Sequence, residues 1–188
     1  MSSNVNQGFA AKPAKQVKAV LGELENMVSE SPSTDRACLK LAQILRVRRS
    51  EVALLRLEKG SLKFIFPPEL RSAGVLPLSG SAVAARTAST RAPLLSNSFM
   101  RVKHVSLFEA VKLGAEEEDK NLEQMPIQKI MSVPIVNSEN VVGVAQISRK
   151  GLDPSISGAD FTAEDLRQLE EAAKILARMP FMKEGAEI

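Results

Sequence analysis

The side chains best suited to covalent or metal chemistry are scarce in this sequence. Its 188 residues include one histidine, His104, and one cysteine, Cys38. A single cysteine excludes a disulfide framework and any multi-cysteine zinc site. No Ser-His-Asp set has support, because the only histidine has no triad-like neighbourhood. We therefore expect no enzyme of these types, and His104 is left as the one candidate for a lone functional imidazole.

Polar residues within apolar segments are better candidates for binding a small molecule. Ser132 interrupts the apolar run 130–136, and Gln146 and Ser148 share one face of a predicted strand. A few polar groups in a mainly apolar cavity orient a ligand. The same groups would be satisfied core residues if a helix covered them. Both interpretations stay open.

Three other features have simpler explanations. The carboxylates of the acidic run 116–119 are consecutive, so they cannot converge on one cation, and no glycine-punctuated calcium loop surrounds them. Ser79-Gly80-Ser81 could hold an anion at a helix start, but ordinary capping explains it as well. Cys38 lies on the apolar stripe of a predicted helix and is interpreted as a core residue.

Composition excludes several classes of protein. An apolar fraction of 44% with 25% charged residues is typical of a globular domain. No run of 18 apolar residues predicts a membrane span, and the N-terminus lacks the features of a secretory signal. With a net charge of +3, seven Phe, and no Trp or Tyr, the chain is poorly suited to stack nucleic-acid bases. We expect a cytoplasmic protein that contacts neither membrane nor nucleic acid.

The hydrophobic periodicity predicts an α+β domain. Period-two segments predict strands, several of them joined as antiparallel hairpins, at 51–58, 62–66, 92–97, 130–136 and 141–148. Amphipathic or capped segments predict helices at 13–29, from Ser33 or Thr34 to about 46, at 82–88, from Ser106 to Gly114, and from Thr162 to Met179. The expected fold is a central antiparallel sheet of five to six strands, with helices on its faces and long N- and C-terminal helices. The expected boundaries are a disordered tail at 1–12, one domain at 13–180 and a C-terminal tail at 181–188.

Several motifs in the second half of the chain resemble the closing half of a GAF domain. They are Val133-Pro134-Ile135, Val142-Gly143-Val144, Gln146, Lys150, Phe161-Thr162 and Asp165. The resemblance covers roughly residues 33–178, and the element order agrees with it. It implies a sensory module with a pocket between one sheet face and residues 97–128, and a homodimer paired through the terminal helices.

The resemblance does not name a ligand or a cofactor. Cyclic-nucleotide-binding members carry an Asn-Lys pair, a Phe and an Asp-Glu pair. This chain matches Lys150, Phe161 and Asp165 but has Arg149 and Leu166 in the other two positions. Lys150 and Asp165 are more simply interpreted as a structural ion pair. His104 is the candidate for a haem ligand, Cys38 is no bilin attachment site, and one cysteine disfavours methionine sulfoxide reduction.

The sequence as a whole predicts a stand-alone, non-catalytic, GAF-like sensor that binds a small ligand and signals through a dimeric helix bundle. The expected ligand-binding residues are Asn97, Phe99, His104, Phe108, Met131, Val133 and Gln146. One alternative is a ligand-free interaction and dimerisation module. The other is a small enzyme that uses His104.

Overall fold

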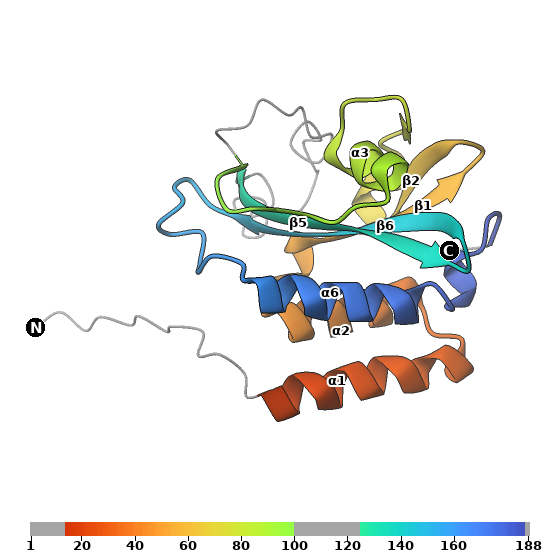
Figure 1. Ribbon diagram of the computed structural model, residues 1–188, viewed down its shortest axis with the longest axis horizontal. Helices are drawn as coiled ribbons and strands as arrows, with labels where there is room; N and C mark the ends of the chain where they lie inside the picture. The colour runs from red at the N-terminus through yellow and green to blue at the C-terminus, as the bar shows by residue number, and fades with distance from the viewer. Residues whose placement is uncertain (1–13, 100–124, 187–188) are drawn as a thin grey trace, which may run out of the picture.

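A six-stranded antiparallel sheet lies at the centre of the molecule, with helices on both faces (Figure 1). The computed structural model describes residues 14–99 and 125–186. The strands are β1 (Val52–Glu58), β2 (Ser61–Phe66), β3 (Val75–Pro77), β4 (Leu94–Ser96), β5 (Ile127–Asn137) and β6 (Asn140–Lys150), in the spatial order β3-β2-β1-β6-β5-β4. The α-helices are α1 (Ala14–Asn26), α2 (Thr34–Leu45), α3 (Val83–Thr90) and α6 (Ala163–Leu176). This confirms the predicted fold class.

The three central strands are apolar on both faces, so both faces need a cover. On β1, Val52 and Leu54 belong to the main core under α2 and α6, whereas Ala53 and Leu55 pack with α3. The β5–β6 hairpin continues the same two-sided pattern along its length. Strand β1 pairs antiparallel with β6, with Leu54 opposite Ala145. This pairing joins the β1–β2 and β5–β6 hairpins into one sheet.

The helices form three layers around the sheet. Helices α2 and α6 cover one face, α1 lies outside them, and α3 lies alone on the opposite face (Figure 1). Both predicted N-terminal caps are present. The Ser33 hydroxyl accepts from Arg36 N at 3.2 Å, and Thr162 and Asp165 form a reciprocal capping box at the start of α6. These caps fix where α2 and α6 begin.

Several boundaries differ from those predicted. Strand β3 was not expected, since three residues carry too little periodicity to reveal a strand. Helix α6 ends at Leu176 rather than Met179. The predicted C-terminal tail instead packs on the fold over residues 181–186, where Phe181 and Met182 are buried and the Arg56 guanidinium donates to the carbonyl of Phe181 at 2.8 Å. The predicted N-terminal tail at 1–12, the helix at 106–114 and the acidic run lie outside the described residues.

Within the described parts of the chain, every helix is too short or too polar to cross a bilayer.

Gly143 is the point of closest approach between β6, β1 and the C-terminal segment. A Cβ built there would lie 2.2 Å from the carbonyl oxygen of Leu55 and 2.5 Å from Cε of Met182. We predict that Gly143→Ala lowers the free energy of unfolding in urea by about 2–4 kcal/mol, because the backbone of a central strand must move.

Gly22 gives the matched control for this substitution. It is exposed in α1, and a Cβ there would meet nothing within 4 Å. Gly22→Ala should stabilise the protein by about 0.5–1 kcal/mol through helix propensity. Equal effects of the two substitutions would contradict the packing described for Gly143.

Candidate functional site

A small polar network lies on the face of the sheet that α3 covers. Ala84, Ala85 and Ala88 keep the helix close to the sheet, and Thr87 reaches down so that its hydroxyl lies 2.8 Å from Ser132 Oγ on β5. The amide nitrogen of Gln146 on β6 donates to the same Oγ at 3.3 Å. All three side chains are buried: Thr87 is 2%, Ser132 0% and Gln146 6% exposed. The network therefore gathers two hydroxyls and a carboxamide between α3 and the sheet.

Apolar side chains lie beside this network on the same face. Val83, Phe99, Ile127 and Ile130 form a separate buried cluster, with Leu94 packed against it. Phe99 is 2% exposed and comes from the segment that leaves β4. The α3-facing surface thus combines hydroxyls, a carboxamide oxygen and an apolar patch, which are the groups that orient a small ligand in a mainly apolar site.

The seven predicted ligand-binding residues do not gather in one place. Gln146 and Phe99 lie on the α3-facing surface. Met131 and Val133 point to the opposite face and are buried in the main core with α2 and α6. Alternate residues of a strand face opposite sides, so neither can share a site with Ser132 or Gln146. His104 and Phe108 lie outside the described residues.

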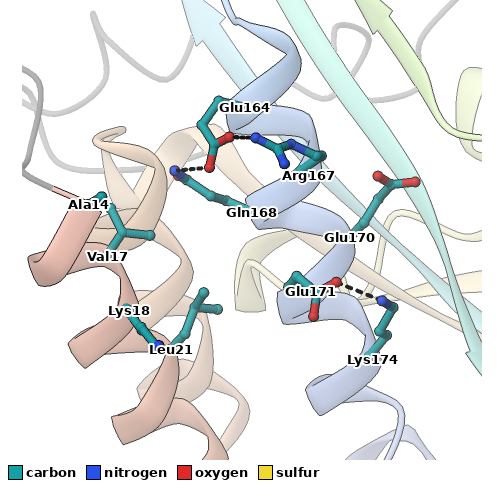
Figure 2. A pocket seen from close by; sticks show the side chains of 10 residues that line it. All are labelled: Ala14, Val17, Lys18, Leu21, Glu164, Arg167, Gln168, Glu170, Glu171 and Lys174. Atoms are coloured by element: carbon teal, nitrogen blue, oxygen red, sulfur yellow. Dashed lines mark hydrogen bonds and ion pairs between the residues drawn. The ribbon is translucent and has the colours of Figure 1, made fainter.

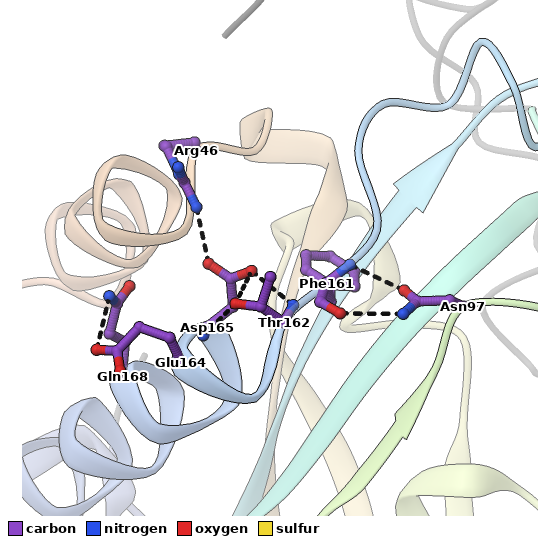
Figure 3. Close-up of polar contacts among 7 residues, drawn as sticks. All are labelled: Arg46, Asn97, Phe161, Thr162, Glu164, Asp165 and Gln168. Carbon is purple, nitrogen blue, oxygen red and sulfur yellow. Dashed lines mark hydrogen bonds and ion pairs between the residues drawn. The ribbon is translucent and has the colours of Figure 1, made fainter. Parts of the chain in front are cut away.

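Asn97, the remaining predicted residue, lies just after the end of β4 and has a different set of partners. Its side-chain nitrogen donates to the carbonyl of Phe161 at 3.0 Å, and its side-chain oxygen accepts from the N–H of Phe161 at 2.9 Å (Figure 3). Both ends of the amide are committed to one backbone residue. Asn97 therefore holds the chain at the start of α6.

The ion pair at the start of α6 involves a different cation from the one predicted. The Arg46 guanidinium donates to Asp165 Oδ1 at 2.8 Å, and the other carboxylate oxygen closes the capping box with Thr162 (Figure 3). The backbone N–H of Lys150 donates to Glu51 at 2.8 Å. Arg46 was missed because it is 119 residues away from Asp165 in the chain. The contact ties the end of α2 to the beginning of α6.

Arg149, noted above only as a departure from the cyclic-nucleotide-binding pattern, is a buried cation. Its guanidinium carbon lies 4.7 Å from the centre of the Phe161 ring, and its Nε is buried without a hydrogen-bond partner. Burial lowers the pKa of Arg149. The negative charges of the nearby Glu51 and Asp165 raise it and so partly offset this effect. The stacking on Phe161 adds a third contact at the start of α6.

A second candidate surface is a groove of about 450 Å³ between α1 and α6 (Figure 2). Val17 and Leu21 are among its apolar lining, and its charged lining comprises three acidic and three basic residues, namely Glu164, Glu170, Glu171, Lys18, Arg167 and Lys174. Within α6, Lys174 pairs with Glu171 at 2.6 Å and Arg167 pairs with Glu164 (Figure 2). The groove therefore has an apolar part and walls of balanced charge.

Cys38 lies in α2 within the main core, on the side of the sheet opposite Gln146. Burial raises its pKa well above the ordinary value, with a smaller contribution from Asp35. Among the described residues, no three His, Cys, Asp or Glu side chains converge where they could hold a metal ion.

The GAF domain family matches residues 33–178 of the sequence, and the chain therefore belongs to this family. A search of curated protein sequences finds no match. Among solved structures, the GAF domain of a phosphoenolpyruvate-protein phosphotransferase from Acinetobacter aligns with a TM-score of 0.64 at 13% identity, covering 88% of this chain and 92% of that one.

Two further structures show the range of proteins that share this fold. The GAF domain of a two-component sensor histidine kinase from Bacillus halodurans aligns with a TM-score of 0.52 at 20% identity, covering 78% of this chain and 93% of that one. Free methionine-R-sulfoxide reductase from Neisseria meningitidis, solved in complex with its substrate, aligns with a TM-score of 0.56 at 15% identity, covering 93% and 94%. GAF domains are known as sensory, ligand-binding domains of signalling proteins.

The polar network makes a prediction about stability. Ser132→Ala removes the acceptor shared by Thr87 and Gln146, so it should lower the free energy of unfolding by about 1–3 kcal/mol. Thr87→Val should also destabilise, and the double variant should lose less than the sum of the two. Urea unfolding of the wild type, both single variants and the double variant measures this coupling. Strictly additive losses would contradict the contact.

Proposed function

We propose that this protein is a non-catalytic sensor that binds a small ligand on the α3-facing surface and signals through a dimer paired by α1 and α6. The observation that carries the proposal is the buried polar network of Thr87, Ser132 and Gln146 beside an apolar cluster in a GAF fold. A few polar groups within a mainly apolar environment orient a small ligand.

The ligand chemistry follows from the groups on this surface. A ligand that fits would carry an N–H or O–H donor for Gln146 and an apolar part for Phe99, Ile127 and Ile130. The Ser132 hydroxyl, already next to Thr87 and Gln146, would orient the polar end of the ligand. These groups favour a small, uncharged or weakly polar molecule.

The proposed dimer uses the groove between α1 and α6. In a symmetric dimer the same surface meets itself, so a patch of one sign would repel its copy. This groove carries three acidic and three basic residues around Val17 and Leu21, so two copies can face each other without net repulsion. A ligand would shift the population between two arrangements of these helices.

The burial of Cys38 argues against a cysteine-based reaction. A thiolate is the reactive form of cysteine, and burial keeps this thiol protonated on the face away from Gln146. This chain shares its fold with a methionine sulfoxide reductase, but its described residues include no accessible cysteine thiol that could act as a nucleophile. The two competing functions are a ligand-free interaction module and a small enzyme that uses His104.

A thermal-shift screen against nucleotides, haem and small metabolites tests ligand binding. We expect at least one compound to raise the melting temperature, since a ligand at about 100 times its Kd stabilises the native state by about 2.7 kcal/mol. Gln146→Leu should reduce the shift, whereas Gln43→Leu, at an exposed position on α2, should leave it unchanged. The absence of any stabilising compound would favour the interaction module, and a turnover that His104→Ala abolishes would favour the enzyme.

Sedimentation velocity tests the dimer. The wild type should sediment with twice the 20.4 kDa mass of one chain. Leu21→Glu should yield a folded monomer, because it places an unpaired charge in the apolar part of the groove. Leu39→Glu, which changes a 46% exposed leucine outside the groove, is the control and should remain dimeric. A monomeric wild type would refute this part of the proposal.

A further inference from the structure

The start of α6 is held by contacts from three separate parts of the chain. Asn97 binds both backbone groups of Phe161 from the sheet edge, Arg149 stacks on the Phe161 ring from the end of β6, and Arg46 binds Asp165 from the end of α2. Phe161 is 3% exposed. The position of Phe161 therefore determines where α6 begins relative to the sheet.

The Asn97 contact differs from the other two in what it connects. Strand β4 is the last strand of the sheet, and the paired hydrogen bonds from Asn97 add Phe161 to that edge much as a neighbouring strand would. Two residues further along the chain, Phe99 is buried with Val83, Ile127 and Ile130 on the α3-facing surface. Residues 97–99 thus contact the start of α6 at one end and the candidate ligand-binding surface at the other.

We infer that residues 97–99 are the mechanical link between the α3-facing surface and helix α6, with Asn97 as the positioning residue that transmits displacement of Phe99 to Phe161. The inference deepens the proposed function and rests on it for the source of the displacement. Only Ser98 lies between Asn97 and Phe99, so a shift of Phe99 reaches Asn97 directly. Both hydrogen bonds to Phe161 must then stretch or carry the first turn of α6 with them.

Hydrogen exchange of the backbone amides of Phe161 to Leu166, measured by NMR on the full chain without ligand, tests this link. Asn97→Ala should speed exchange of these amides about tenfold, because two hydrogen bonds that hold the segment are lost. The last turn of α6 should keep its wild-type rates. Asn137→Ala, at an exposed position at the end of β5, is the matched control and should leave the start of α6 unchanged.

A second pair of variants tests whether Asn97 transmits the effect of Phe99 or only holds Phe161 in place. Phe99→Leu should speed exchange at Phe161 to Leu166 in the wild-type background and should add nothing when Asn97 is already alanine. Wild-type rates in Phe99→Leu, or equal acceleration in both backgrounds, would overturn the inference. So would unchanged exchange in Asn97→Ala.

The two proposals fail in different ways. The exchange rates are measured without ligand, so a screen with no stabilising compound would remove the sensor function and leave the link between Phe99 and α6 standing. A stabilising compound together with uncoupled exchange rates would retain the sensor and remove Asn97 from its signalling route.

Discussion

Burial of the central strands on both faces is the constraint on which the rest of the structure depends. Strands β1, β5 and β6 carry apolar side chains on each side, so the sheet can exist only between two covers. Helices α2 and α6 fill one side with a continuous apolar core. On the other side α3 is short and built of small residues, and the sheet there carries Ser132 and Gln146. This asymmetry gives the two faces different compositions: one is a continuous apolar core, and the other carries buried polar side chains.

The same asymmetry explains why the start of α6 matters. Helix α6 lies on the structural face, but its first residues are reached from the sheet edge by Asn97 and from the end of α2 by Arg46. Arg46 adopts a left-handed backbone conformation at the end of α2, with φ of 56°, which a non-glycine residue rarely does. The ion pair with the buried Asp165 helps to stabilise that conformation. These polar contacts thus join the end of α2 and the edge of the sheet to the start of α6.

Much of the fold could be predicted from local patterns. Alternation of apolar residues located both long hairpins, and capping residues located the starts of α2 and α6. The sequence could not reveal β3, which is too short for a period, or the partner of Asp165, which comes from a distant segment. Residues 181–186 were assigned to a tail although Phe181 and Met182 are apolar, and those two side chains could have indicated packing.

The candidate site was predicted less well, and strand geometry explains why. Residues 131 and 133 lie on the opposite face from residues 132 and 146, so alternation alone could have separated Met131 and Val133 from Gln146. Which of two apolar faces would be covered by the main helices depends on the whole packing and not on the local pattern. Asn97 was predicted to line a pocket because it begins the segment 97–128 that the resemblance places over the sheet. Its partners, the N–H and carbonyl of Phe161, come from a segment 64 residues away.

The most direct test of the central claim is a crystal structure of the protein with a compound that stabilises it. The account predicts the compound between α3 and the sheet, with a donor atom within hydrogen-bond distance of Gln146 Oε1 and its apolar part against Phe99. A compound bound at another place, with the space between α3 and the sheet filled by the protein's own side chains, would contradict it.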